Sequence, residues 1–504
     1  MAPESQPSEL AATVGALITR ADDRPALIAP GGPTLTYARL HDAVGSLAAE
    51  LRAVGVGPGD TVALTVGNGP HTVVCFLAVL ATRGAAAPLN PAYTETEARA
   101  YLDDLLPSVL IAEPGPRNGA VEACAALGVR TLQVAGAAGG GFTLGVAGAA
   151  DPGEGSQPDD VALVLHTSGT TSRPKVVPLR QRNLVSSIRG IVASYGLGAS
   201  DVSHCVMPLF HVHGLVASTL STLASGGTVI VPPRFSAGAF WTDTVAHSAT
   251  WFSAVPTIHQ VLALRADAEP IPTEHRLRFA RSCSAALSPT LQDRVESLIG
   301  VPLLQAYGMT EASHQMATNP LPPGDRRAAS VGLATGIEIA ILDDEWRPLG
   351  PETPGEVSIR GASVVDGYRD NPDANAASFR DGWFRTGDVG RLSSDGYLTL
   401  DGRIKELINR GGEKISPFEV EEALLTHASV REAVAYGVPD EKYGEVVAVV
   451  VVTDGGAGER ELSEHCAARL AAFKVPVSIT SMDAIPKGPT GKVQRRLLAE
   501  IVRR

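Results

Sequence analysis

The sequence predicts an α/β protein with a parallel sheet in its N-terminal part and a small α/β domain near its C-terminal end. Strand-like and helix-like segments alternate over the first 110 residues, which is the order that a parallel sheet requires. Beyond residue 400 a basic, turn-rich segment precedes a second α/β pattern of about 100 residues, enough for a small domain. The 504 residues suffice for roughly two to four folding units with cores of their own.

The individual elements are predicted from capping residues and from the spacing of apolar residues. A helix is expected after Thr36, whose side chain can cap it, because apolar residues then repeat every three or four positions, at Leu40, Val44, Leu47 and Leu51. The next elements are expected to be a strand at 61–66, a helix at 71–81, a strand at 86–89, a helix at 96–106 and a strand at 109–112. Residues 135–160, rich in Gly and Ala and then acidic, are interpreted as a surface linker before a strand at 161–165. The C-terminal pattern predicts a helix at 417–426, strands at 434–438 and 446–453, and a helix at 461–472.

Composition argues against several classes of protein. The formal net charge of −12 disfavours non-specific binding to nucleic acid or to an anionic membrane. The five cysteines lie far apart without CxxC spacing, so neither a disulfide framework nor a cysteine zinc site is expected. The polar, acidic first residues do not resemble a signal peptide, and the longest apolar runs are too short to cross a bilayer. We therefore expect a soluble cytoplasmic protein, either a monomer or a homodimer, with no nucleic-acid or membrane partner.

The strongest local motif follows the predicted strand at 161–165. Its small residues offer backbone N–H groups and hydroxyls that can surround phosphate oxygens, namely Thr167, Ser168, Gly169, Thr170 and Thr171. Lys175 adds a positive charge nearby. The Walker pattern GxxxxGK[ST] is absent, and composition alone favours a flexible turn over a phosphate loop.

Three further clusters suggest a nucleotide site. The first cluster contains Tyr307, Gly308, Thr310 and Glu311. Its aromatic ring suits adenine, its glycine allows close backbone approach, its hydroxyl suits phosphate and its carboxylate suits Mg²⁺. Asp388 can accept hydrogen bonds from ribose hydroxyls, and Arg403 supplies a guanidinium. A Gly/Pro-rich loop at 486–492 ends on Lys492.

Taken in this order, the motifs resemble those of the adenylate-forming superfamily, which contains acyl-CoA synthetases, luciferases and non-ribosomal adenylation domains. The resemblance extends over residues 10–500. It implies a large N-terminal domain of β-sheets packed with helices at 1–403, which binds the acid and ATP, and a small mobile α/β lid at 404–504. The implied hinge lies near Lys405. The implied reaction uses ATP, Mg²⁺ and CoA: a carboxylate displaces pyrophosphate from ATP, and a thiol then displaces AMP.

The resemblance also implies roles for individual residues. It assigns the catalytic step to Lys492, Glu311, Thr310 and His211, and Mg²⁺ binding to Thr167 and Glu311. Phosphate binding is assigned to residues 167–171 and Lys175. Adenosine binding is assigned to Ser284, Ala285, Ala286, Tyr307, Gly308, Asp388 and Arg403. After rotation of the lid, Gly412 and Lys414 are expected to border the pantetheine tunnel.

The predicted acyl pocket is unusually polar. His213, Ser284 and His314 are donors that can hold a second carboxylate beside the one that is adenylated, whereas His211 is favoured as a gate or structural residue. His211 and His213 lie two residues apart and are interpreted as facing one way on a strand. The sequence shows no third ligand beside them, so a zinc site is not expected.

Within the superfamily, the phrases PLFHVHGL, RSCSAALSP and MTEASHQMATNPLP most resemble those of oxalate–CoA ligases. Malonyl-CoA synthetases commonly have an arginine at the position of Ala306, which counts against malonate. One departure from the superfamily pattern is Val176, where glycine is usual after the lysine.

Two groups of alternatives stay open at this point. The first is a related adenylating enzyme for another small oxyacid, for a malonate-like acid, for carrier-protein loading, or for nitrite-dependent diazotisation of an amine. The second is an inactive nucleotide-binding homologue, against which the retained residues argue, namely Glu311, Asp388, Arg403 and Lys492.

Replacing Lys492 with Ala is expected to abolish adenylation, because the lysine is assigned to bridge the carboxylate and the α-phosphate in the first step only. Thiolation of a supplied acyl-adenylate is expected to stay largely intact. The two steps are measured separately, as acid-dependent pyrophosphate release from ATP and as acyl-CoA formation from the adenylate. An equal loss of both steps would contradict the assigned role.

Overall fold

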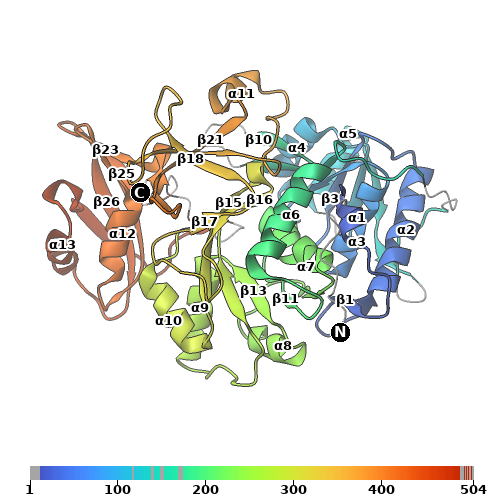
Figure 1. Cartoon of the computed structure of the whole chain (residues 1–504), viewed down its shortest axis with the longest axis horizontal. Coiled ribbons are helices and arrows are strands. Elements are labelled where there is room, and N and C mark those ends of the chain that lie inside the picture. Colours follow the sequence, from blue (N-terminus) through green and yellow to red (C-terminus); the bar gives the residue numbers. More distant parts are fainter. Residues whose placement is uncertain are drawn as a thin grey trace.

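The computed structural model describes residues 12–115, 118–137, 141–147, 153–167 and 174–488, together with residues 493, 495, 498 and 501 (Figure 1). Five predicted site residues lie outside this part of the chain: Ser168, Gly169, Thr170, Thr171 and Lys492. No helix in the described ranges has the length and apolar character needed to cross a membrane.

A six-stranded sheet forms the N-terminal part, in the order β10-β9-β4-β3-β5-β6. Its strands are β3 (Thr61–Thr65), β4 (Ala85–Pro88), β5 (Val109–Ala112), β6 (Arg130–Gln133), β9 (Val161–Thr167) and β10 (Lys175–Arg180). All pairs are parallel except β9 with β10, which confirms the predicted parallel sheet. Every element predicted between residues 36 and 112 is present with its ends within one residue.

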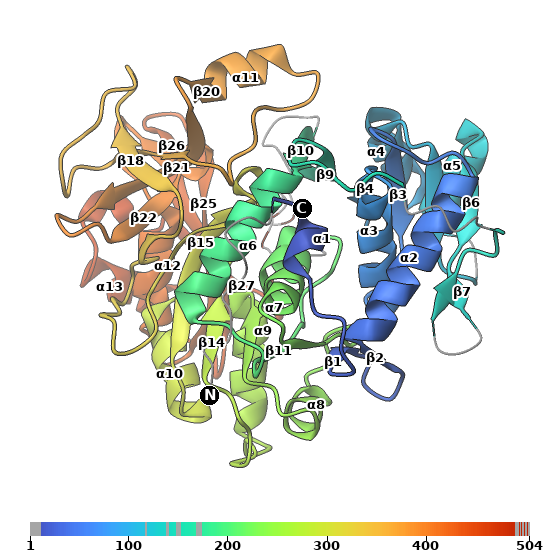
Figure 2. The same cartoon turned by 45° about the vertical axis from the view of Figure 1, so that its right-hand side comes forward.

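Helices cover both faces of this sheet, because alternate side chains of each strand point to opposite faces. Val62 and Leu64 pack in the cluster that contains α2 and α3, whereas Ala63 packs in the cluster that contains α4 and α5 (Figure 2). The bounds are α2 (Tyr37–Ala53), α3 (Pro70–Ala81), α4 (Glu95–Leu105) and α5 (Gly119–Leu127). As predicted, the Thr36 side chain caps α2 by accepting a hydrogen bond from the N–H of Arg39.

A nine-stranded sheet forms the centre of the molecule, in the order β17-β16-β15-β14-β13-β11-β12-β1-β2. Its strands are β1 (Pro25–Ile28), β2 (Thr34–Thr36), β11 (Val202–His204), β12 (Thr228–Ile230), β13 (Trp251–Ala254), β14 (Phe279–Ser282), β15 (Leu303–Met309), β16 (His314–Thr318) and β17 (Leu333–Ala334). Associated helices are α1 (Val14–Leu17), α6 (Gln181–Tyr195), a π-helix (His213–Leu220), α7 (Ser221–Ala224), α8 (Phe240–Ala246), α9 (Pro256–Ala266) and α10 (Pro289–Ile299). Tyr307 and Gly308 lie inside β15, which pairs with β16 in antiparallel orientation.

A third sheet leads toward the C-terminal domain. It contains β18 (Glu338–Leu342), β19 (Gly355–Arg360), β20 (Phe379–Arg380), β21 (Trp383–Leu392) and β22 (Leu398–Arg403), with α11 (Pro372–Ser378) beside it. A separate sheet follows, built from β23 (Ile408–Arg410), β24 (Glu413–Ile415), β25 (Val430–Asp440), β26 (Gly444–Thr453) and β27 (Ser478–Ser481), with α12 (Pro417–Leu425) and α13 (Glu459–Ala467). The mixed α/β architecture with a large N-terminal part and a small C-terminal domain agrees with the predicted fold class (Figure 1).

Two predicted elements differ from the structure. The helix expected at 461–472 ends at Ala467, because the chain reaches extended backbone angles at Ala471 before a short 3₁₀ turn. The strand expected at 434–438 is longer and becomes β25, since β26 pairs with it over its whole length.

The predicted surface linker at 135–160 is also partly wrong. Strands β7 (Ala135–Gly136) and β8 (Phe142–Thr143) form a small antiparallel pair, and the segment after it packs on α2. The buried carboxylate of Glu50 accepts hydrogen bonds from the Thr143 hydroxyl and from the N–H groups of Leu144 and Val146. A carboxylate on α2 therefore anchors residues that composition alone assigns to a linker.

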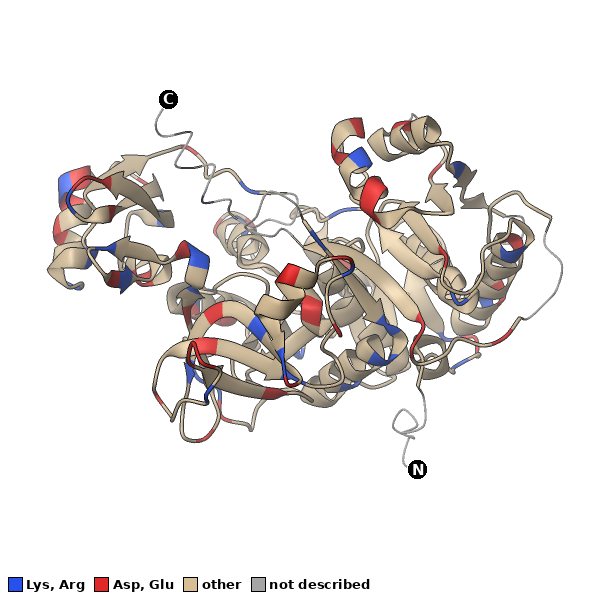
Figure 3. Cartoon of the chain, turned by 90° about the horizontal axis from the view of Figure 1, so that it is seen from above, with Lys and Arg blue, Asp and Glu red and all other residues tan. Residues whose placement is uncertain are grey.

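Acidic and basic residues occur over both the N-terminal part and the C-terminal domain (Figure 3). The negative net charge is thus distributed over the molecule.

Replacing Glu50 with Ala is expected to lower the free energy of unfolding by about 1–3 kcal/mol, because the N–H groups of Leu144 and Val146 lose their acceptor. Urea denaturation measures the change, and limited proteolysis reports whether residues 141–147 become accessible. The exposed Glu274→Ala serves as the control, with an expected effect below about 0.5 kcal/mol. A Glu50→Ala effect no larger than that of the control would contradict the anchoring role.

Candidate active site

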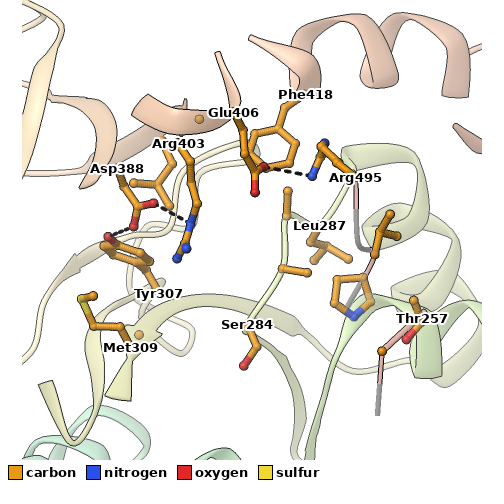
Figure 4. A pocket seen from close by; sticks show the side chains of 18 of the residues that line it. Thr257, Ser284, Leu287, Tyr307, Met309, Asp388, Arg403, Glu406, Phe418 and Arg495 are labelled. Carbon is orange, nitrogen blue, oxygen red and sulfur yellow. Dashed lines mark hydrogen bonds and ion pairs between the residues drawn. The ribbon is translucent and has the colours of Figure 1, made fainter. Parts of the chain in front are cut away.

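A cavity of about 2280 Å³ lies where the central sheet, the third sheet and the C-terminal domain meet (Figure 4). It brings together most of the described residues that the sequence singles out. These are Thr167, Lys175, His211, Ser284, Ala285, Ala286, Tyr307, Gly308, Thr310, Glu311, His314, Asp388, Arg403 and Lys405. His213, Gly412 and Lys414 are not among the residues that line it.

Asp388 is held by two neighbours at the wall of the cavity. The Tyr307 hydroxyl donates a hydrogen bond to one carboxylate oxygen, and the Arg403 guanidinium lies 3.0 Å from the other (Figure 4). The pairing of β21 with β22 places Asp388 opposite Arg403, so the contact follows from strand register. Burial, followed by the Asp388 charge, raises the pKa of Tyr307, which keeps the phenol protonated and able to donate.

Glu311 lies in a 3₁₀ turn (Thr310–Ala312) directly after β15. Its carboxylate is buried and accepts a hydrogen bond of 2.8 Å from the Tyr368 hydroxyl. Burial raises the pKa of Glu311, although the Tyr368 hydrogen bond and the charges of Arg403 and Lys175 oppose this effect.

Tyr368 connects Glu311 with Lys175. The Lys175 ammonium lies 4.3 Å from the centroid of the Tyr368 ring, in a cation–π contact. Burial lowers the pKa of Lys175, and the Glu311 carboxylate opposes that shift. Sequence reasoning missed Tyr368, because it lies in a loop between β19 and α11 without a periodic pattern or a motif around it.

Val176, the departure from the superfamily pattern, belongs to strand β10. Its side chain is buried in the cluster that includes Val164, and its carbonyl accepts a hydrogen bond from the Arg369 N–H. Val176 is therefore part of the regular strand that begins at Lys175.

The predicted acyl pocket is built around Ser284, which follows β14 and adopts a positive φ of 73°. His213 lies behind it, with Nδ1 3.1 Å from the Ser284 hydroxyl and Nε2 2.7 Å from the Ser253 hydroxyl. His213 begins a π-helix and is fully buried, so it does not share a strand face with His211 as predicted. His213 thus does not line the cavity itself but contacts Ser284 and the His314 ring, which both line it.

A fully buried arginine, Arg281, lies behind this pocket and was missed by sequence reasoning. Its Nε donates to the Tyr195 hydroxyl at 2.8 Å, and its Nη2 donates to Gln315 Oε1 at 3.0 Å. Its Nη1 lies 2.9 Å from the Ser253 hydroxyl and 3.4 Å from His314 Nε2. The available signal was a charged residue within an otherwise buried parallel strand, a position that is normally apolar.

Several segments of the C-terminal domain line the cavity, including α12, β25 and the residues around position 492. Lys487, Gly488, Val493 and Arg495 line the cavity on either side of position 492. Arg495 lies 3.1 Å from Glu406 and 2.6 Å from Glu421, whose pKa burial raises to about 7 (Figure 4). Gly412 and Lys414 instead lie in the β23–β24 hairpin, away from the cavity.

Two family models match the chain. The model described as AMP-binding enzyme matches residues 16–369, and the model described as AMP-binding enzyme C-terminal domain matches residues 419–492. The chain belongs to the AMP-binding enzyme family.

Relatives within this family match nearly the whole chain. An oxalate–CoA ligase of Arabidopsis thaliana is 48% identical and covers 95% of this chain and 95% of its own length. An oxalate–CoA ligase of Saccharomyces cerevisiae is 41% identical, with coverages of 88% and 86%. The crystal structure of ATP-bound MatB from Rhodopseudomonas palustris superposes with a TM-score of 0.89 at 30% identity, covering 98% of this chain and 99% of that one.

The cavity residues of this AMP-binding enzyme fit a magnesium ion shared with a nucleotide. Glu311 offers a carboxylate and Thr167 a hydroxyl, and Mg²⁺ prefers oxygen ligands. Within the described ranges, no group of three or more His, Cys, Asp or Glu residues gathers that could hold a metal ion. Such sparse protein ligation is typical of Mg²⁺ that is bound largely through substrate phosphates and water.

The raised pKa of Glu311 predicts a pH-dependent requirement for Mg²⁺. As the pH falls, Glu311 takes up a proton at a higher pH than an ordinary glutamate and loses the charge that attracts the metal. We expect the Mg²⁺ concentration for half-maximal AMP formation to rise as the pH falls from 7.5 to 5.5.

Two variants test the origin of this pH dependence. Glu311→Gln is expected to need more Mg²⁺ at pH 7.5 and to show a weaker dependence of the half-maximal Mg²⁺ concentration on pH. Because ATP is protonated equally in both assays, this variant also serves as the control for that effect. Tyr368→Phe removes the hydrogen bond that favours the carboxylate and is expected to move the profile to higher pH. Identical profiles for Glu311→Gln and the unmodified enzyme would contradict the prediction.

Proposed function

We propose that this enzyme is an oxalate–CoA ligase, which uses ATP to activate oxalate and transfers the oxalyl group to CoA. The observation that carries the proposal is the polar end of the acyl pocket, where Ser284 and His314 line the cavity in front of the buried Arg281. Donors in such a place favour an acid with a second anionic group, because a purely apolar acyl chain would leave them unpaired. The two oxalate–CoA ligases that match nearly the full chain support the same substrate.

In the first step an oxygen of one oxalate carboxylate forms a bond to the α-phosphorus of ATP. The bond between this phosphorus and the bridging oxygen breaks, and pyrophosphate leaves. Lys175, with the loop that precedes it, stabilises the departing phosphates, while Asp388 accepts hydrogen bonds from the ribose and Tyr307 flanks the adenine. Glu311 and Thr167 would hold Mg²⁺, which would supply further charge neutralisation.

In the second step the CoA sulfur, after loss of its proton, forms a bond to the activated carbonyl carbon. The bond from that carbon to the AMP oxygen breaks, which gives oxalyl-CoA and AMP. Gly412 and Lys414 would border the pantetheine in this step, and neither lines the cavity in the present arrangement. A change in the position of the C-terminal domain is therefore part of the proposal.

The proposed movement requires two domains joined by a hinge. We place the boundary at residues 403 and 404 and the hinge at Lys405. In support, β22 ends the third sheet at Arg403, whereas β23 opens a separate sheet at Ile408. Lys405 itself lies in the short 3₁₀ turn between the two sheets.

A cytoplasmic location is part of the proposal. The five cysteines are all free and buried, as expected for a protein of a reducing compartment.

The test is AMP release from Mg·ATP with oxalate, malonate, glyoxylate, acetate or nitrite, each with and without CoA. We expect CoA-dependent AMP release with oxalate and a kcat/KM for oxalate at least about 100-fold above that for acetate or glyoxylate. Malonate as the preferred acid would overturn the choice of oxalate. Activity with nitrite plus an arylamine would overturn CoA as the acceptor, and no release with any acid would overturn the enzymatic proposal.

A further inference from the structure

Arg281 is a buried positive charge without a carboxylate partner in the described part of the chain. Its side chain is fully buried between the central sheet and the end of α6, where the Tyr195 ring also packs. Its hydrogen-bond partners are the hydroxyls of Tyr195 and Ser253, the amide oxygen of Gln315, the His314 ring and the Cys283 side chain, none of which is a carboxylate. Burying a cation is costly unless an opposite charge compensates it, so the missing counter-charge calls for an explanation.

Strand register places Arg281 at the start of a chain of hydrogen bonds. β13 pairs with β14 so that Ser253 lies opposite Arg281, and the Arg281 Nη1 donates to the Ser253 hydroxyl at 2.9 Å. Nε2 of His213 lies 2.7 Å from the same hydroxyl, and Nδ1 of His213 lies 3.1 Å from the Ser284 hydroxyl. The chain thus extends from the buried cation to a side chain that lines the cavity.

The direction of each hydrogen bond in this chain follows from the donors available. A guanidinium only donates, so the Ser253 oxygen must accept from Arg281. The single Ser253 proton then needs an acceptor, and His213 Nε2 is the one within reach among the described residues. An imidazole that accepts at Nε2 carries its proton at Nδ1, and that N–H donates to the Ser284 oxygen. The Ser284 proton is left to point away from His213.

We propose that Arg281 is a positioning residue for substrate recognition, which through Ser253 and His213 turns the Ser284 hydroxyl into a hydrogen-bond donor toward the distal carboxylate of oxalate. The substrate carboxylate then supplies the negative charge that Arg281 otherwise lacks. This proposal rests on the proposed function. It deepens that function, because it names the residues that distinguish a dianionic acid from a monoanionic acid of the same size.

Ser253→Ala tests the chain, because it removes the link to His213 and leaves the Arg281 bonds to Tyr195 and Gln315 in place. We expect the KM for oxalate to rise at least about tenfold and the preference for oxalate over glyoxylate in kcat/KM to fall by a similar factor. The KM for ATP is expected to change less than about twofold. Ser253→Thr keeps a hydroxyl and is expected to restore much of the preference.

The matched control is Ser203→Ala. Ser203 is a fully buried serine on the adjacent strand β11, and its hydroxyl has no hydrogen-bond partner in the described structure. The control is expected to keep the kinetics of the unmodified enzyme. Arg281→Met is measured in parallel, with circular dichroism to show that it folds, and is expected to lose the same preference.

The outcomes separate this proposal from the proposed function. If the unmodified enzyme prefers oxalate while Ser253→Ala behaves like Ser203→Ala, the hydrogen-bond chain is wrong and the function stands. If Ser253→Ala raises the KM values for oxalate, glyoxylate and ATP alike, the chain is structural and the proposal fails. An unmodified enzyme without activity on oxalate would overturn both.

Discussion

The buried carboxylate of Asp388 links the central sheet to the third sheet at the wall of the cavity. It receives the Tyr307 hydroxyl from the central sheet and the Arg403 guanidinium from the last strand of the third sheet. Tyr307 therefore cannot move relative to β22 without leaving a buried charge less well compensated, which is expensive in an apolar interior. Asp388 therefore fixes the positions of Tyr307 and Arg403 at this wall of the cavity.

A second set of contacts, centred on Tyr368, fixes Glu311 and Lys175 in a similar way. Tyr368 donates to Glu311 with its hydroxyl and receives the Lys175 ammonium on its ring. One aromatic side chain thus positions an acidic and a basic group that would otherwise pair directly. Keeping the two apart leaves the carboxylate available for a metal ion and the ammonium available for phosphate.

The sequence predicted the sheet-and-helix order well, because the N-terminal strands and helices have clear apolar spacing and caps such as Thr36. It also identified most residues of the cavity wall, since these fall in contiguous motifs. It missed Tyr368 and Arg281, whose importance depends on contacts between distant strands and loops. It misplaced His213 on a strand, because two histidines at a spacing of two are compatible with a strand and give no sign of a π-helix. Glu50 shows the same limit, since composition does not reveal which carboxylate anchors a Gly-rich segment.

The ion pairs of Arg495 limit where the chain can bend between the third sheet and the C-terminal domain. Arg495 pairs with Glu406, the last residue of the 3₁₀ turn, and with Glu421 on α12, so Glu406 is fixed to the C-terminal domain. On the other side of the turn, Arg403 is fixed to Asp388. Only Ile404 and Lys405 lie between these two anchored positions, so as long as both ion pairs persist, any rotation of one domain against the other is concentrated in the backbone torsions of two residues.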